Sequence, residues 1–311
     1  MRTRRLGEGL LPVLLVSPSV LALLVFVYGF IGWTGYVSLS NWNTFVPNLS
    51  FAGLKNYLFL FKDFRFQSDL RNTLFFAVLF IGICLVLGLI LALLVDQKLR
   101  AAGLFRSIFL FPMALSFVVT GVVWQWILNP GTGINLWLKA LGAKSPPLWF
   151  VSTKIVPSID LGKIEFGLPL AILAVVIAAV WQMSGFAMAT YLAGLQGIPE
   201  DVKEAARVDG ASEWQTLRRI VLPMLRPMTI SIIIMLAHVS FKTFDLVYAM
   251  TGPGAMYVTD VPGVYMFETA FRGNFMANGA AIAMVMLVLS AVVTVPYLLT
   301  SGRRDLDVDA T

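Results

Sequence analysis

The sequence predicts an all-α membrane protein with about six transmembrane helices. Of its 311 residues, 58% are hydrophobic and only 13% are charged. A soluble globular domain carries about 25% charged residues, so this composition indicates a surface that faces lipid over much of its area. The hydrophobic residues also gather in separate stretches, each long enough to cross a bilayer as a helix of roughly 20 residues.

Six stretches have this length and composition, and we expect residues 1–311 to form one transmembrane domain. The stretches are residues 11–37, 72–95, 105–128, 168–192, 228–250 and 279–300. The first stretch follows three arginines and is longer than the core of a signal peptide, so we interpret it as a retained signal anchor. The fifth stretch is unusual because it contains His238, Lys242 and Asp245.

The distribution of Lys and Arg predicts that both chain termini lie in the cytoplasm, because cytoplasmic loops of membrane proteins are enriched in these residues. In this orientation, Arg2, Arg4, Arg5, Lys98 and Arg100 are cytoplasmic, and residues 129–167 form an outer loop. The same rule accounts for the net charge of +6, and no basic run with interleaved aromatic residues indicates a nucleic-acid partner.

The chemistry-bearing residue types are too few for most kinds of metal or redox site. The chain has one cysteine, Cys84, and one histidine, His238. These counts exclude a disulfide within the chain, a cysteine metal cluster and a site with several histidines. We therefore expect no metal site and no catalytic residues.

The most informative polar segment is residues 197–227, which is predicted to form two short helices. Pro199 suits the first helical position, and Gly210 suits the position after a helix where the backbone takes a positive φ. Ser212 and Gln215 have the spacing of a capping box, which predicts the start of the second helix. From the pattern alone, such a segment either lies on the membrane surface or docks against a partner.

The segment contains three short motifs, namely Glu204-Ala205-Ala206, Gly210 and Ile220-x-Leu222-Pro223. These motifs resemble the EAA loop of permease subunits in binding-protein-dependent ABC importers. The resemblance implies the type I importer permease fold, with residues 197–227 as the cytoplasmic loop that docks on a separate ATPase subunit. It implies that Glu204 contacts the ATPase and that Gly210 is the hinge between the helices. The residues that match the family's loop are Glu204, Ala205, Ala206, Asp209, Gly210, Leu222 and Pro223.

The resemblance covers nearly the whole chain and implies the first-subunit type of sugar permease, as in maltose and glycerol-phosphate importers. Residues 51–73 resemble the first outer loop of such permeases, and residues 111–138 resemble their third span and the outer helix that follows. The implied location is the cytoplasmic (inner) membrane of a prokaryote. The implied partners are a second permease subunit in a heterodimer, two ATPase subunits that bind ATP and Mg, an extracytoplasmic sugar-binding protein and the lipid bilayer.

Ionisable and polar side chains in the fifth span mark the predicted substrate path. Residues three or four apart lie on one face of a continuous helix, and this spacing joins His238, Lys242, Asp245 and Tyr248. A charged side chain at the centre of a span costs about 2.5–3.5 kcal/mol, so it usually faces a cavity or a partner. Phe241 and Phe244 flank this set, and aromatic faces beside hydrogen-bonding groups suit a sugar. Two structural interpretations stay open: Lys242 and Asp245 only pair with each other, or His238 only bonds a neighbouring helix.

Trp181 and Gln182 of the fourth span are further candidates for the path, although a Trp in a helix bundle also serves in packing. Residues 236–247 resemble permeases of the glucose/mannose type, together with residues 259–262 and 279–281. This resemblance implies glucose or mannose as the substrate. Another carbohydrate or glycerol phosphate is the alternative substrate.

The sequence contains no motif for nucleotide binding or hydrolysis. A G-x-x-x-x-G-K-[ST] loop is missing, so ATP must be hydrolysed by another chain if the importer interpretation holds. We therefore expect that the chain is not an enzyme and binds no cofactor of its own. An ion-coupled secondary transporter is the competing transport class, but we find no internal repeat of the kind common in that class. A membrane scaffold would leave the charged fifth span unexplained.

Overall fold

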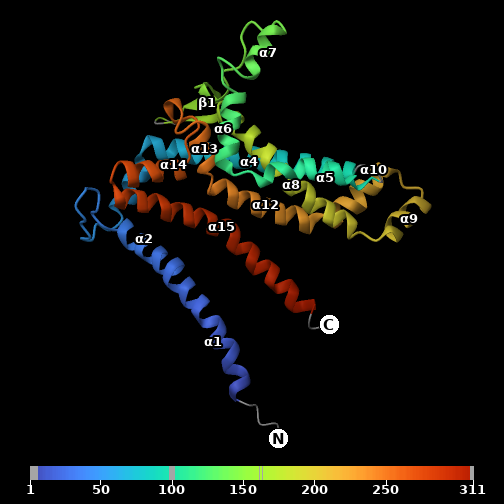
Figure 1. The fold of residues 1–311 in the computed structure, drawn as a ribbon, viewed down its shortest axis with the longest axis horizontal. Helices are drawn as coiled ribbons and strands as arrows, with labels where there is room; N and C mark the ends of the chain where they lie inside the picture. Colours follow the sequence, from blue (N-terminus) through green and yellow to red (C-terminus); the bar gives the residue numbers. More distant parts are fainter. Residues whose placement is uncertain (1–5, 98–101, 161, 163, 309–311) are drawn as a thin grey trace. The chain divides into compact units, whose positions relative to one another are not determined.

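The computed structural model describes residues 6–97, 102–160, 162 and 164–308, with side chains described between residues 13 and 296 of these ranges (Figure 1). Arg2, Arg4, Arg5, Lys98 and Arg100, on which the predicted orientation partly rests, lie outside the described residues. The chain divides into two compact units. The first comprises residues 1–62 and 266–285, and the second comprises residues 63–265 and 286–311.

The described residues confirm an all-α membrane fold with about six spans. Four single helices are long and apolar enough to cross a membrane, and two bent helix pairs raise the number to six if each pair forms one span. The single helices cover the predicted first, second, fourth and sixth spans. One bent pair is Ala102–Ala114 with Phe117–Ile127, which bends by 99° within the predicted third span. The other is Glu213–Met224 with Arg226–Phe241, which bends by 61° just before the predicted fifth span and contains most of that span.

The first unit begins with a continuous helical segment whose residues 13–30 are all exposed, as suits contact with lipid or with another chain. A loop after this segment is tied to a later helix, since Asn278 N donates to Asn43 Oδ1 over 3.0 Å. The elements of this unit are α1 (Leu6–Leu23), η1 (Leu24–Gly29), α2 (Phe30–Ser38), α3 (Lys55–Lys62), η6 (Glu268–Arg272) and the first part of α15 (Met276–Val308).

The second unit contains the remaining elements, with α9 and α10 toward one end and the strands and α13 toward the other (Figure 1). Its elements are α4 (Phe64–Asp96), α5 (Ala102–Leu110), η2 (Phe111–Ala114), α6 (Phe117–Ile127), α7 (Ile134–Ala140), η3 (Trp149–Val151), β1 (Ile155–Asp160), β2 (Glu165–Pro169), α8 (Ile172–Gln196), α9 (Glu200–Val208), α10 (Glu213–Thr216), η4 (Leu217–Val221), α11 (Leu222–Met224), α12 (Arg226–Phe241), α13 (Asp245–Met250), η5 (Ala255–Tyr257), α14 (Pro262–Phe267) and the rest of α15.

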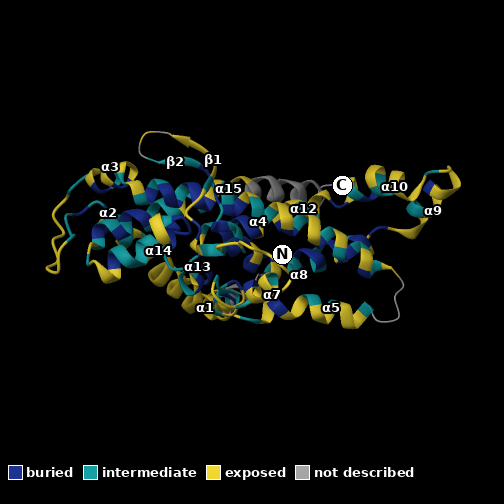
Figure 2. Ribbon diagram, turned by 90° about the horizontal axis from the view of Figure 1, so that it is seen from above, coloured by how far each residue is buried: buried dark blue, intermediate teal, exposed yellow. Residues whose placement is uncertain are grey.

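Helices α4 and α8 form the core of the second unit. Phe76 and Phe80 of α4 are buried and stack with their ring centroids 5.3 Å apart. Gly88 lets α4 approach α8 closely, because a Cβ at this position would lie 2.5 Å from the Cβ of Ala187. Small residues allow such close approach between helices in a membrane, where the hydrophobic effect does not drive them together. Figure 2 shows buried residues along these two helices and mostly exposed ones on α9.

The fifth span is not the single continuous helix that the sequence predicted. Helix α12 ends at Phe241 and α13 begins at Asp245, so residues 242–244 form a break. The third span is likewise interrupted, between η2 and the start of α6 at Phe117. His238 therefore lies before the break and Asp245 after it, and the prediction that they share one face of a continuous helix is wrong.

The predicted outer loop 129–167 contains a strand hairpin that the sequence did not indicate. Besides α7, it holds most of a hairpin in which β1 and β2 pair antiparallel, with Ile155 opposite Pro169 and Asp160 opposite Glu165. The pairing is irregular between Val156 and Ile159. Proline and glycine weaken a strand pattern, and both occur within these strands, which explains why the pattern was missed.

Candidate functional site

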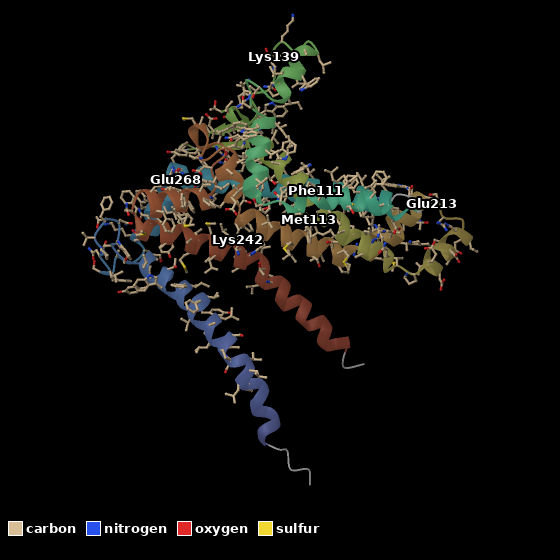
Figure 3. The ribbon with its side chains drawn as sticks, viewed as in Figure 1. Phe111, Met113, Lys139, Glu213, Lys242 and Glu268 are labelled. Carbon is tan, nitrogen blue, oxygen red and sulfur yellow. The ribbon has the colours of Figure 1, made fainter. Side chains whose placement is uncertain are left out.

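The two helix breaks meet at a cavity of about 310 Å³ in the second unit. It is lined on one side by Phe117, the first residue of α6, and on the other by the break between α12 and α13. The predicted path residues that line it are His238, Lys242, Phe244 and Asp245. The structure thus brings four of the sequence-predicted residues together, although by a broken helix and not by a continuous face. Figure 3 marks Lys242 within this part of the chain.

Hydrogen bonds to the last turn of α12 stabilise the break in the fifth span. The backbone N–H of Lys242 donates to the carbonyl of His238 over 3.3 Å, and Thr243 Oγ1 donates to the carbonyl of Val239 over 2.9 Å. Lys242 thus sits at the carboxyl end of α12, and Asp245 is the first residue of α13. A cation near a helix C-terminus and an anion near an N-terminus are each favoured by the helix dipole.

Lys242 and Asp245 line the cavity without forming a close ion pair. Among the ion pairs that the described part of the chain makes within 4.0 Å, none joins these two side chains. Both side chains are exposed in the isolated chain. Each charge instead lies at the helix end whose dipole complements it, so both remain available to a ligand in the cavity.

The α6 wall of the cavity was not predicted from the sequence. Helix α6 packs so closely on α13 that a Cβ at Gly121 would lie 2.9 Å from the carbonyl oxygen of Leu246. Phe117 stands one helical turn before Gly121, and this packing positions its ring at the cavity. A small residue one turn from an aromatic residue was the signal available in the sequence, but the same pattern occurs in ordinary helix packing.

The other predicted path residues lie outside the cavity lining. Tyr248 stacks on Phe244 with ring centroids 5.2 Å apart, so it supports a lining residue from behind. Phe241 is half-buried at the end of α12. Trp181 packs edge-on against Trp124 and lines a separate apolar cavity between α4, α5 and α8.

Gln182 has a structural position at the break of the third span. Its side chain is 2% exposed, and its Nε2 donates to the carbonyl of Leu115 over 2.7 Å. Leu115 lies between η2 and α6, where the helix cannot satisfy its own carbonyl. Gln182 therefore stabilises the bend that places Phe117 at the cavity.

The predicted coupling loop, residues 197–227, is folded as the sequence indicated. Helix α9 is followed by Gly210, two residues after its last residue, with a φ of 79°. The N–H groups of Gly210 and Ala211 donate to the carbonyls of Arg207 and Ala206 over 3.0 and 2.9 Å, respectively. This pattern is the Schellman motif, which requires a left-handed residue. Ser212 and Gln215 form the predicted capping box at the start of α10. Pro199 stands one residue earlier than predicted, at the N-cap of α9.

The loop presents an exposed surface with a rigid backbone. Glu204, Ala205, Asp209, Gly210 and Pro223 are exposed, whereas Ala206 is buried and Leu222 is half-buried. Two further apolar side chains are exposed, Val208 at 87% and Trp214 at 66%. Exposed apolar side chains on an ordered segment indicate a surface that another protein covers.

One ion pair joins the two helices of the loop, and a second lies within α9. Arg207 on α9 lies 3.9 Å from Glu200 and 3.4 Å from Glu213, which is labelled in Figure 3. Behind the loop, a cleft of about 520 Å³ is bounded by the ends of α4 and α8. Trp214, Leu217 and Val221, which follow Ser212 at the start of the second helix, line this cleft.

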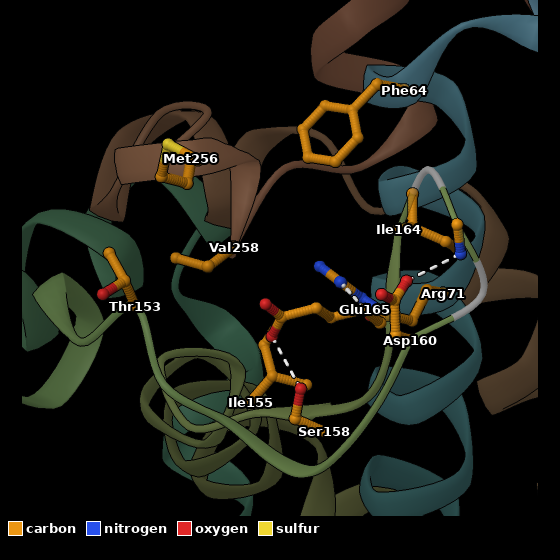
Figure 4. Close-up of a pocket in the computed structure, with 11 residues that line it drawn as sticks. Phe64, Arg71, Thr153, Ile155, Ser158, Asp160, Ile164, Glu165, Met256 and Val258 are labelled. Carbon is orange, nitrogen blue, oxygen red and sulfur yellow. Dashed lines mark hydrogen bonds between the residues drawn. The ribbon is translucent and has the colours of Figure 1, made fainter.

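A third cavity, of about 530 Å³, lies between the strand hairpin and the beginning of α4 (Figure 4). Arg71 enters it from α4 and donates from Nη1 to the carbonyl oxygen of Glu165 over 2.7 Å. Ser158 Oγ donates to the Glu165 carboxylate over 2.9 Å. The bond from Arg71 attaches the hairpin to α4, and the bond from Ser158 joins the two strands of the hairpin.

Comparison with known proteins identifies the family. The family described as "Binding-protein-dependent transport system inner membrane component" matches residues 84–301, a range that includes both helix breaks and the coupling loop. A probable ABC transporter permease protein of Pyrococcus horikoshii is 37% identical over 297 residues, which cover 94% of this chain and 96% of that protein. The xylose/arabinose import permease protein of Haloferax volcanii is 38% identical over 278 residues, covering 88% of this chain and 82% of that protein.

A solved structure shares the fold. A chain in the crystal structure of a bacterial ABC transporter involved in import of the acidic polysaccharide alginate matches with a TM-score of 0.78 and 19% identity, covering 96% of this chain and 99% of that one. The likeness confirms the type I importer permease fold. The family match and the two relatives show that the chain belongs to the binding-protein-dependent transport system inner membrane components, which are permeases of ABC transporters.

Proposed function

We propose that this chain is a pore-forming permease subunit of an ATP-driven sugar importer and that the cavity at the two helix breaks lies on the sugar's path. The composition of the cavity lining is the main observation that supports this proposal. It combines the aromatic rings of Phe117 and Phe244 with the charged groups of Lys242 and Asp245. Sugars have apolar C–H faces and a rim of hydroxyl groups, so rings provide stacking surfaces and charged groups bind the hydroxyls.

Broken helices suit alternating access. Irregular backbone at membrane depth is tolerated where it lines a cavity, and it allows the two halves of a span to move against each other. A movement of α6 relative to α13 would change the width of the cavity, because Phe117 and Asp245 line it from these two helices. The cavity need not bind the sugar tightly, since an extracytoplasmic binding protein delivers it in this scheme.

The exposed loop 197–227 supports the proposed coupling to ATP hydrolysis. In this proposal Glu204 contacts a separate ATPase subunit that binds ATP and Mg, and the ion pair between Arg207 and Glu213 links α9 to α10 so that the two helices move together. A second permease subunit completes the pore as a heterodimer. In this orientation both termini and the loop 197–227 are cytoplasmic, so the loop lies on the same side of the membrane as the ATPase.

Glucose or mannose is the sugar that the sequence resemblance favours, and the relatives widen the range to test. The glucose import permease of Saccharolobus solfataricus is 28% identical over 295 residues, less than the 38% of the xylose/arabinose permease. The trehalose/maltose permease of Thermococcus litoralis is 31% identical over 300 residues. A panel for this chain therefore contains glucose, mannose, xylose, arabinose, trehalose, maltose and glycerol phosphate.

The test is reconstitution of the complex in liposomes. The chain is co-expressed with its neighbouring permease and ATPase genes, and ATP hydrolysis is measured with binding protein loaded with each compound of the panel. We expect one loaded form to stimulate both hydrolysis and uptake. If no ATPase co-purifies and uptake follows an ion gradient, the chain is an ion-coupled carrier and the proposal is wrong.

A further inference from the structure

A buried polar cluster joins the beginning of α4 to residues 255–265, the segment that follows α13. It shares no residue with the cavity at the helix breaks or with the coupling loop. Asn72 on α4 donates from Nδ2 to the carbonyl of Tyr257 over 2.7 Å and to that of Asp260 over 2.9 Å. The segment 255–265 is thus fastened to α4 by side chains that the transport proposal leaves unused.

The carboxylate of Asp260 is well stabilised. Arg65 donates from Nε to Asp260 Oδ2 over 2.6 Å, and Asp260 Oδ1 accepts the N–H of Val261 over 3.0 Å. The Arg65 guanidinium also lies 4.8 Å from the ring centroid of Tyr257 and 4.5 Å from that of Tyr265. A charge-assisted bond to an arginine favours the ionised form of this carboxyl group.

Asp69 has no such donor. Its side chain is 0% exposed, and neither carboxyl oxygen accepts a hydrogen bond from a donor among the described residues. Arg65, Asp69 and Asn72 lie on one face of α4, and Arg65 and Asn72 both bond Asp260, so the buried Asp69 side chain is on the side of α4 that faces Asp260. Two ionised carboxylates only accept hydrogen bonds and repel each other, so a bond between these groups requires a proton on one of them.

The charged groups around Asp69 and Asp260 do not remove the need for a proton on one of the two carboxyl groups. The Arg71 guanidinium donates to Asn72 Oδ1 and to the carbonyl of Glu165, and the Glu165 carboxylate lies near it as a counter-charge. Asp63 adds a further negative charge near Asp69. Burial and the neighbouring Asp63 raise the pKa of Tyr265, so its phenol stays neutral. Arg65 therefore stands against two fully buried carboxyl groups.

We propose that Asp69 and Asp260 form a proton-binding site, in which Asp69 carries one proton and donates it to the carboxylate of Asp260. The proton compensates the negative charge that Arg65 leaves unpaired and holds the segment 255–265 on α4. When the proton leaves for solvent, two buried carboxylates remain against one guanidinium. The site's ligand is the proton, and its occupancy sets the stability of this contact.

The sign of the pH dependence follows from linkage. Unfolded aspartate loses its proton near pH 4, so above about pH 4 the folded chain holds one proton more than the unfolded chain. Stability falls with rising pH wherever the folded state binds more protons. The extra proton of the folded state is therefore expected to make the Tm of the assembled complex fall as the pH is raised from about 5 to about 9.

The variant Asp69→Asn separates the pH dependence of Tm caused by the Asp69–Asp260 pair from that caused by other groups. Asn has the shape of a protonated aspartate and donates to Asp260 from its amide at every pH. We expect Asp69→Asn to have a smaller pH dependence of Tm than the parent and a higher Tm at the alkaline end. The matched control is Asp160→Asn, since Asp160 is exposed and its Oδ1 acceptor for Gly162 N is kept by Asn. The control should retain the parent's pH dependence.

Two further measurements decide whether the ligand of the Asp69–Asp260 site is a proton or a metal cation. Infrared spectroscopy of the complex should show the carbonyl stretch of a protonated carboxyl group, shifted in D₂O and missing in Asp69→Asn. At fixed pH, replacing sodium and potassium by choline should leave the parent's Tm unchanged. The proposal fails if Tm follows the alkali cation, if the infrared band persists in Asp69→Asn, or if Asp69→Asn does not assemble while Asp160→Asn does.

Discussion

Replacing Gly121 with alanine is expected to push α6 away from α13 and so disturb the cavity between them. A Cβ at position 121 would lie 2.9 Å from the carbonyl oxygen of Leu246 and 3.0 Å from the Cβ of Ala249. Ordinary van der Waals contact begins at 3.4 Å, so the helices must separate by about 0.5 Å, the difference between 3.4 and 2.9 Å. Because the nearest atom belongs to the backbone of a helix, side-chain rotation cannot relieve the contact.

The magnitude follows from measured costs of overpacking. Adding one methyl group to a well-packed interior costs about 1–3 kcal/mol. For a domain of this size, each kcal/mol lowers the Tm by roughly 2–4 °C. We therefore expect Gly121→Ala to lower the Tm of the purified complex by several degrees and to slow sugar uptake, since Phe117 moves with α6.

The matched control is Gly82→Ala in α4. A Cβ at Gly82 meets nothing within 4 Å, so this variant adds the same methyl group to a helix without a clash. Thermal unfolding of the purified complex and uptake into liposomes are measured for both variants. If Gly121→Ala matches Gly82→Ala in Tm and in uptake, the close α6–α13 contact does not shape the cavity and the reasoning is refuted.

Two further predictions concern the coupling loop and the charged break. Gly210→Ala forces a Cβ into a left-handed residue, at about 1–2 kcal/mol, and should lower the number of sugars transported per ATP hydrolysed; Gly197→Ala, at a φ of −82°, is the control. An unchanged ratio in both variants would contradict the coupling role of this turn. Exchange of Lys242 and Asp245 places each charge at the wrong helix end and should abolish uptake in a normally assembled complex. Retained uptake, both in the exchanged variant and in a variant neutral at both positions, would mean that neither charge is needed for transport.

Features set by local sequence were predictable. Gly210 occupies a position that needs a positive φ, and Ser212 with Gln215 forms a capping box; both depend on residues a few positions apart. The number of spans was predictable as well, because the length of an apolar stretch is fixed by the thickness of the bilayer.

The break in the fifth span was not predictable, because the sequence there has no residue that forces one. Residues 242–244 are Lys, Thr and Phe, with neither proline nor glycine. In the third span, the break is supported by Gln182, which is 67 residues away from the carbonyl of Leu115 that it binds. Tertiary contacts of this kind override the local pattern, so the cavity at the breaks could be located only in the folded chain.

The buried cluster around Asp69 shows the same limit. Arg65 and Asp260 are 195 residues apart in the sequence, and nothing local pairs them. A charged residue near the start of an apolar helix ordinarily indicates the membrane boundary. The proposed role of Asp69 in a proton-binding site depends on Asp260, which only the fold places beside it.

The most direct test of the account is whether sugar occupies the cavity at the helix breaks during transport. Phe117→Cys places a thiol on the cavity wall, and Val118→Cys places one on the adjacent residue, which does not line it. Cys84, the one cysteine of the chain, is buried, so the parent provides the unreactive background. A membrane-impermeant thiol reagent should block uptake through Phe117→Cys and not through Val118→Cys, and transported sugar should slow the reaction at position 117. If the reagent affects both variants equally, or if sugar gives no protection, the cavity does not lie on the sugar's path.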